Sequence, residues 1–181
     1  MILCYTIKKE SDNMKEKLNK QPLTSIYNLL NELNTKYEIH YHEEEGEYTY
    51  LKEDDLCITI SNPYNEFPLY IDIIDDEIIL EYYKWHGHYF YETIVPDNLL
   101  QDIKEILTNK KCAIIISSTK RWISSTLSDK FLEESYDYQD DFKRLPECFV
   151  DEIHAIGGKV ELFYWNPKNT KTIYIKKEAK E

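Results

Sequence analysis

The sequence predicts a single α+β domain over residues 1–181, with a mainly antiparallel β-sheet flanked by helices. Three observations favour this class. The chain has 181 residues, of which 42% are hydrophobic and 31% are charged, and both its length and its composition are those of an ordinary globular domain. Apolar residues recur with a helical period in some blocks and alternate in others. The alternating blocks are joined by short polar turns, which suit antiparallel strands because parallel strands need long crossovers.

The first half of the chain predicts a helix followed by a meander. Ile26, Leu29, Leu30 and Leu33 recur on one helical face, so a helix is expected from Pro22 to Tyr37. A short strand is expected earlier, over residues 2–7. From Glu38 to Tyr83 the period is two, which predicts a curved sheet of four or five strands. The expected segments are 38–43, 47–53, 56–62, 68–75 and 77–83.

The second half predicts helices mixed with strand pairs. Five apolar residues share one face between Asp97 and Leu107, and Asp97 suits the N-cap of that helix. Beyond it the expected elements are a hairpin (111–118 and 121–127), a short helix from Ser128 or Asp129 toward Tyr138, a helix over 146–156 stopped by Gly157-Gly158, and closing strands at 160–165 and 172–177.

The cysteines and the N-terminus indicate a cytoplasmic protein. Cys4, Cys57, Cys112 and Cys148 form no C-x-x-C pair, and the first three lie in apolar runs, so all four are interpreted as reduced thiols of the core. The N-terminal apolar stretch has no basic residues before it, which argues against a signal peptide. Apolar runs are far shorter than the ~20 residues of a membrane span.

The net charge restricts the partners. The chain carries −12 at pH 7 and has a pI of about 4.9. This charge repels nucleic acid and anionic membranes and favours a basic protein partner. Acidity that merely keeps the protein soluble is the plainer alternative.

Tyrosine is abundant and often lies beside acidic residues. Sixteen tyrosines are present, and tyrosine is enriched at protein interfaces because it offers a large, rigid ring with a polar tip. The stretch from Tyr136 to Asp141 is expected to be too polar for the core. The predicted partner-binding residues are therefore Glu133, Glu134, Tyr136, Asp137, Tyr138, Asp140 and Asp141.

Histidines support a second hypothesis. In the segment Trp85-His86-Gly87-His88-Tyr89, a continuing strand would place His86 and His88 on one face, where they could bind one metal ion. His40 and His42 repeat the spacing, and Glu43 or Asp72 could add a carboxylate. The alternative is that these imidazoles are hydrogen-bonded to carboxylates or hydroxyls without any chemistry.

Motifs for other chemistry are missing from the sequence. It contains no G-x-S-x-G elbow, no phosphate-binding loop and no dinucleotide fingerprint. No catalytic residue and no cofactor are therefore assigned. Ser117, Ser118, Ser124 and Ser125 are expected to face solvent on the hairpin.

The acidic strand, the WHGHY segment, the following helix and the hairpin with Lys120-Arg121-Trp122 resemble small acidic bacterial proteins of the polymorphic-toxin immunity type. The resemblance covers residues 68–127, and WHGHY is its most specific element. It implies a binding protein that neutralises a cognate toxin and carries no catalytic residues. A metal-dependent hydrolase or metal-binding protein using His86 and His88 is the alternative, and a domain with an unknown small ligand is a third.

Overall fold

The computed structural model describes residues 21–75, 77–90, 96–129 and 136–177. It confirms the α+β class: two antiparallel sheets are accompanied by helices. The chain divides into two compact units, each assembled from three segments. Unit 1 comprises Met1–Ser61, Tyr70–Leu80 and His88–Lys104, and unit 2 comprises Asn62–Leu69, Glu81–Gly87 and Glu105–Glu181. The expectation of a single domain over residues 1–181 stays a prediction.

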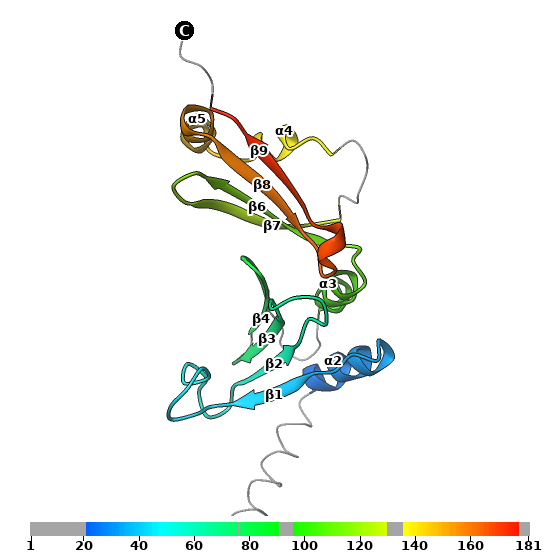
Figure 1. Ribbon diagram of the computed structural model, residues 1–181. Helices are drawn as coiled ribbons and strands as arrows, with labels where there is room; N and C mark the ends of the chain where they lie inside the picture. The colour runs from blue at the N-terminus through cyan, green and yellow to red at the C-terminus, as the bar shows by residue number, and fades with distance from the viewer. Residues whose placement is uncertain (1–20, 76, 91–95, 130–135, 178–181) are drawn as a thin grey trace, which may run out of the picture. The chain divides into compact units, whose positions relative to one another are not determined.

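The first sheet is the predicted meander, with five strands in the order β1-β2-β3-β4-β5 (Figure 1). Its strands are β1 Glu38–Tyr41, β2 Leu56–Ile60, β3 Leu69–Ile74, β4 Glu77–Tyr82 and β5 Trp85–Phe90. β1 and β2 are antiparallel, with Glu38 opposite Thr59 and Tyr41 opposite Leu56. Sequential order in space follows from the short polar connections.

Two details of the predicted meander are wrong. Residues 47–53 form turns instead of a strand, closed by bonds from the Leu51 amide to the Tyr48 carbonyl and from the Asp55 amide to the Lys52 carbonyl. Leu51, which breaks the alternation of Tyr48 and Tyr50, is fully buried, whereas Tyr50 is exposed. The strand ending near Tyr83 does not continue into WHGHY either. Tyr83 has φ 57°, which turns the chain back and makes WHGHYF the separate strand β5.

Two helices contribute the other core residues of unit 1. α2 spans Gln21–Glu32 and α3 begins at Asp97 and ends at Leu107, as expected. The apolar face of α2 is buried at Leu23, Ile26 and Leu30, and that of α3 at Leu99 and Ile103.

Polar contacts connect the two helices to their surroundings. Tyr89 of β5 donates a hydrogen bond of 2.5 Å to Asp102 of α3, and Lys104 of α3 pairs with Glu32 of α2 at 3.3 Å. α2 ends five residues before Tyr37, because Asn34 adopts φ 50°, a left-handed conformation that asparagine tolerates.

The second sheet belongs to unit 2 and has the order β7-β6-β8-β9 (Figure 1). β6 Cys112–Ser118 pairs with β7 Trp122–Ser128 on one side and with β8 Gly158–Phe163 on the other, both antiparallel. β9 Lys171–Ile175 pairs antiparallel with β8 after the short helix η1 Pro167–Asn169. These strands confirm the predicted hairpin and closing strands.

Helices α4 Gln139–Phe142 and α5 Glu147–Ile156 contribute to the core of unit 2. Phe142 and Ile153 pack in one buried cluster with Ile114, Val160 and other residues of β6 and β8. The predicted helix over 146–156 is confirmed. Of the short helix predicted from residue 128 toward Tyr138, residues 130–135 lie outside the described residues, and 136–138 are not helical.

The predicted glycine stop after α5 has a steric basis. Gly157 has φ 84°, which side-chain-bearing residues rarely adopt, and a Cβ on Gly158 would lie 2.4 Å from the Ser117 carbonyl oxygen. The two glycines therefore allow α5 to turn directly into β8.

An aromatic cluster gathers around Phe163 at the end of β8. Tyr83 stacks on Phe163 with ring centroids 4.0 Å apart, and Phe67 meets it edge-on at 5.4 Å. Tyr82 contacts both Phe163 and Trp165, and the Asn62 side chain donates 2.9 Å to the Trp165 carbonyl. Residues 62–69 and 81–87 thus belong to unit 2 through aromatic packing. No helix in the described part of the chain is long and apolar enough to cross a membrane.

Candidate functional site

The predicted partner-binding segment is used partly for internal packing. Glu133 and Glu134 lie outside the described residues. Asp141 is 4% exposed and accepts a hydrogen bond from the Tyr136 hydroxyl, while Tyr136 and Tyr138 pack against the core cluster of unit 2. The expectation that this stretch is too polar for the core is wrong here, because the Tyr136 hydroxyl hydrogen-bonds to the buried carboxyl group.

The exposed carboxylates of the same segment also have internal partners. Asp137 accepts a bond of 2.9 Å from the Gln139 amide at the start of α4, and Asp140 pairs with Lys143 at 2.7 Å. Burial raises the pKa of Tyr136, and the adjacent Asp141 carboxyl raises it further. Asp137 and Asp140 are the described carboxylates of this segment that remain at the surface.

A stronger concentration of exposed acid lies between β1 and β2. We call residues 42–55 the acidic loop; it contains seven carboxylates and one lysine. Six of the carboxylates are exposed: Glu43, Glu44, Glu45, Glu47, Glu53 and Asp54. Its lysine, Lys52, is held by Asp75 at 3.0 Å. The loop therefore presents a surface of one charge sign.

Aromatic and polar contacts fix the acidic loop to the sheet of unit 1. Tyr48 stacks on His40 of β1 with centroids 4.0 Å apart and planes within 7°. The Tyr50 hydroxyl donates 2.9 Å to Asp72 of β3, although 52% of Tyr50 remains exposed. Burial raises the pKa of Tyr50, and Cys57 and Asp72 raise it further, so this phenol stays a donor. The loop is thus attached across β1 to β3.

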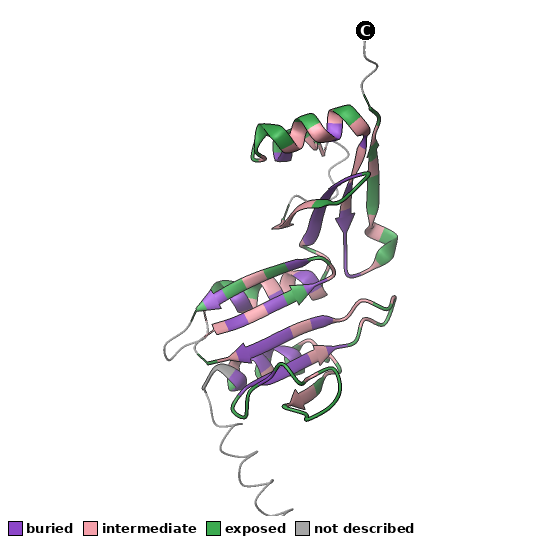
Figure 2. Ribbon diagram, turned by 90° about the vertical axis from the view of Figure 1, so that its left-hand side faces the viewer, coloured by how far each residue is buried: buried purple, intermediate pink, exposed green. Residues whose placement is uncertain are grey.

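In β4 and β5, buried residues alternate with half-buried or exposed ones along each strand (Figure 2). Along β4 and β5, Ile78, Leu80 and Tyr89 are buried, whereas alternate residues are half-buried or exposed. We call the second side the outer face. It carries Tyr70, Asp72, Ile74, Glu77, Ile79, His88 and Phe90.

The two His-x-His pairs of the metal hypothesis lie far from each other. His86 and His88 do share one face of β5, and both are exposed. His88 contacts the Glu77 carboxylate at 2.5 Å. This is the kind of contact expected if the imidazoles are hydrogen-bonded to carboxylates without any chemistry. His40 lies on β1, which is four strand intervals from β5 and thus about 19 Å away.

His42 has a local backbone contact, and the described residues form no metal-binding group. His42 contacts the Leu51 carbonyl at 2.5 Å. Within residues 21–75, 77–90, 96–129 and 136–177, no group of three or more histidine, cysteine, aspartate or glutamate side chains is placed to bind a metal ion.

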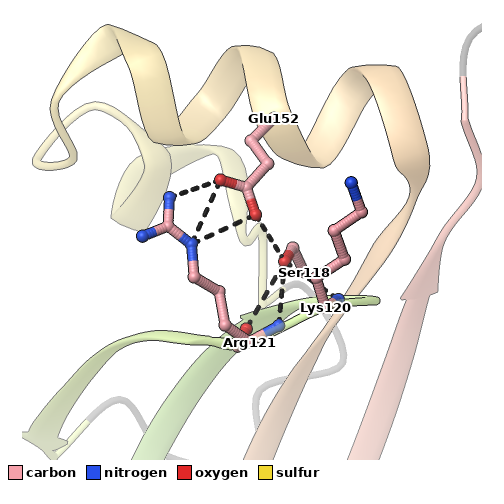
Figure 3. A network of polar contacts seen from close by, with 4 residues as sticks. All are labelled: Ser118, Lys120, Arg121 and Glu152. Atoms are coloured by element: carbon pink, nitrogen blue, oxygen red, sulfur yellow. Dashed lines mark hydrogen bonds and ion pairs between the residues drawn. The ribbon is translucent and has the colours of Figure 1, made fainter.

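A polar network joins the β6–β7 hairpin to α5 (Figure 3). Ser118 donates 2.7 Å to Glu152, and its oxygen accepts from the amides of Lys120 and Arg121 at 3.2 Å each. Arg121 binds the same Glu152 carboxylate through Nε and Nη2. Ser117 and Ser118 are each 7% exposed, so the expectation that they face solvent is wrong; Ser118 closes the hairpin turn instead.

This network has a structural role. The hydrogen bonds from Arg121 and Ser118 lower the pKa of Glu152 to about 2. A carboxylate that stays ionised at neutral pH is a poor general base. Ser118 donates its hydrogen bond directly to this carboxylate and not to a histidine, which is the usual base that activates a serine. The network therefore orders the turn and offers no activated nucleophile.

The cysteines differ in their surroundings. Cys57 and Cys112 are buried and free, and burial raises their thiol pKa values to about 12 and about 11. Cys148 is free but exposed near the start of α5, so its assignment to the core is wrong. Cys4 lies outside the described residues.

Comparison with known proteins adds no relative. No family model matches the chain, and neither a curated protein nor a solved structure is significantly similar to it. The fold and the surface themselves define an acidic α+β protein whose concentrated exposed charge lies on a loop anchored to an open sheet.

The acidic loop is the surface that the sequence reasoning missed. Tyr48 and Tyr50 alternate with polar residues, and this period of two predicts a strand over 47–53. The available signal was the run Glu43-Glu44-Glu45-Gly46-Glu47, followed closely by Asp54-Asp55. Neighbouring like charges of this density are unfavourable in a strand and typical of a solvated loop.

Proposed function

We propose that this chain is a binding protein for a basic protein partner and that it neutralises that partner, as immunity proteins neutralise their cognate toxins. The observation that carries the proposal is the acidic loop: six exposed carboxylates within twelve residues, on a chain of net charge −12. Carboxylates of one sign steer a cationic partner and raise its association rate about 10- to 1,000-fold at low salt.

The physical state of the loop supports this function. Its backbone is held by Tyr48, Leu51 and Tyr50, so the carboxylates are displayed from an anchored segment. Binding to a pre-ordered loop costs less conformational entropy than binding to a loop that must fold around its partner. If the partner is a nuclease, the carboxylates would occupy the place of substrate phosphates.

The segment 133–141 of unit 2 also belongs to the proposal. Asp137, Tyr138 and Asp140 contribute exposed or half-exposed groups in unit 2, and Glu133 and Glu134 remain predicted contacts. Tyr136 and Asp141 are expected to act through the packing of that segment.

The test is co-expression with the product of the adjacent upstream gene. If that product is toxic to the host, the wild-type chain is expected to restore growth and to co-purify with it in equal amounts. A quadruple variant, Glu43→Lys, Glu44→Lys, Glu45→Lys and Glu47→Lys, is expected to slow association at least tenfold at low salt. A toxic product that is neither bound nor suppressed would contradict the proposal.

The control places two charge reversals outside the acidic loop, and it is compared with the double loop variant Glu44→Lys, Glu45→Lys, which has the same change in net charge. Glu38 and Asp97 are exposed acidic residues outside the acidic loop. Charge reversal at these two positions is expected to change the association rate far less than the loop variant, because steering depends on the charges nearest the contact.

A further inference from the structure

We propose that the outer face of unit 1 is the docking surface for this partner, and that it binds an arginine-rich segment with large apolar side chains between the arginines. This inference rests on the proposed function and names the place and the chemistry of its contact. It is carried by the open positions of β4 and β5 together with the acidic loop beside them.

The floor of the surface combines apolar area with a carboxylate. β4 and β5 are joined by the two-residue turn Tyr83-Lys84. Strands pair symmetrically about such a turn, which places Phe90 opposite Glu77 and Ile79 opposite His88. Phe90 is 69% exposed and Ile79 is half-buried, so an aromatic ring and an aliphatic side chain lie beside the Glu77–His88 contact of 2.5 Å.

The acidic loop forms one wall of the same surface. Tyr50 reaches Asp72 on β3, and Lys52 reaches Asp75 at the end of that strand. Both contacts are made on β3, the neighbour of β4 in the sheet order, so the part of the loop around Tyr50 and Lys52 lies beside the outer face. Lys52, the one lysine of the loop, is paired with Asp75.

Charge complementarity selects the occupant. A second copy of the chain would bring another −12 and the same acidic loop toward this face. An arginine-rich segment suits it better, because a guanidinium pairs with carboxylates and also stacks on an aromatic ring such as Phe90. Apolar side chains between the arginines would cover Ile79 and the edge of Phe90. Contacts of this kind dominate protein interfaces.

The experiment uses a probe of this chemistry: the amidated peptide GRLWRGRLWRG, labelled with fluorescein on its N-terminal amine and titrated with the full chain. Anisotropy gives the affinity, and amide chemical shifts of the chain give the location. Saturable binding is expected, with the largest shifts at Ile79, His88 and Phe90. Two control peptides replace arginine by glutamate or the leucines and tryptophans by serine, and neither is expected to bind.

Variants separate the face from general attraction to an acidic protein. Phe90→Ser should weaken the peptide about tenfold. Tyr174→Ser removes another exposed ring, 77% exposed on β9, and is the matched control with unchanged affinity. Both positions are exposed, so both variants are expected to fold. Glu44→Lys with Glu45→Lys should weaken binding and reduce its dependence on salt.

Three results would overturn the inference: no saturable binding, shifts confined to the acidic loop with no effect of Phe90→Ser, or self-association of the chain through the outer face in sedimentation without peptide. Failure of the proposed function is read separately. In that case the peptide still binds the outer face, while co-expression gives neither a complex nor restored growth.

Discussion

Replacing Tyr136 with phenylalanine should destabilise the protein although the predicted partner-binding segment is polar. The substitution keeps the packed ring and removes the hydroxyl that donates to Asp141, whose residue exposure is 4%. A hydrogen bond to a charged group contributes about 1.5–3 kcal/mol, and the ring leaves no cavity to add to this. For a chain of this length the same range corresponds to a fall in Tm of about 3–10 °C.

Urea unfolding followed by circular dichroism measures this change, with the m-value checked for constancy. Tyr174→Phe is the control, because Tyr174 is 77% exposed and the loss of its hydroxyl should cost under about 0.5 kcal/mol of stability. The double variant with Asp141→Ala should show a coupling energy above about 1 kcal/mol. A Tyr136→Phe protein within about 0.5 kcal/mol of wild type would refute the assignment of this pair to internal packing.

Four other changes are expected. Tyr82→Phe should leave the free energy of unfolding unchanged or raise it by about 1 kcal/mol, because the Tyr82 hydroxyl is buried without a hydrogen-bond partner among the described residues; a loss in urea unfolding would contradict this. The pKa of Glu152 in the folded protein is about 2, below the ordinary value of 4.5, so its stabilisation is present above pH 4.5 and is lost as the pH falls through about 2. The stability of Glu152→Gln should differ from that of wild type at neutral pH and converge with it in acid. Parallel pH profiles of stability would contradict the structural role of Glu152. Gly158→Ala should lower Tm by several degrees, equivalent to about 1–3 kcal/mol, because its Cβ would meet the Ser117 carbonyl oxygen at 2.4 Å; an unchanged Tm would rule out that close approach. In a Cys4→Ser background, Ellman's reagent should titrate Cys148 rapidly and Cys57 and Cys112 only on unfolding. Fast reaction of Cys57 and Cys112 in the folded protein would show that the burial of these two thiols is wrong.

Periodicity located most elements because it reflects which side of each is buried. The helix over 97–107 follows from its single apolar face, and the hairpin around Thr119-Lys120 follows from the run of buried residues in β6. The segment 47–53 shows the limit of this signal. Its tyrosines alternate as in a strand, but they are held by stacking on His40 and by a bond to Asp72, which are contacts between segments distant in sequence.

The candidate site was harder to predict for the same reason. The pairing of Tyr136 with Asp141 depends on side-chain geometry within a polar segment, so composition alone favoured solvent exposure. The two His-x-His pairs have equal spacing in sequence, yet β1 and β5 are the two edges of the sheet. Strand order is set by the whole meander, and no local spacing reports it.

The hydrogen bond from Asn62 to the Trp165 carbonyl and the rings around Phe163 affect how the protein folds during its synthesis. Asn62 and Trp165 are 103 residues apart in the sequence. The aromatic side chains of segments 62–69 and 81–87 can therefore pack against Phe163 only after the last strands have been synthesised. Contacts of such long range slow folding and leave apolar rings exposed during synthesis. A ribosome halted before Phe163 would therefore hold a nascent chain with Phe67, Tyr82 and Tyr83 uncovered, a natural substrate for a chaperone.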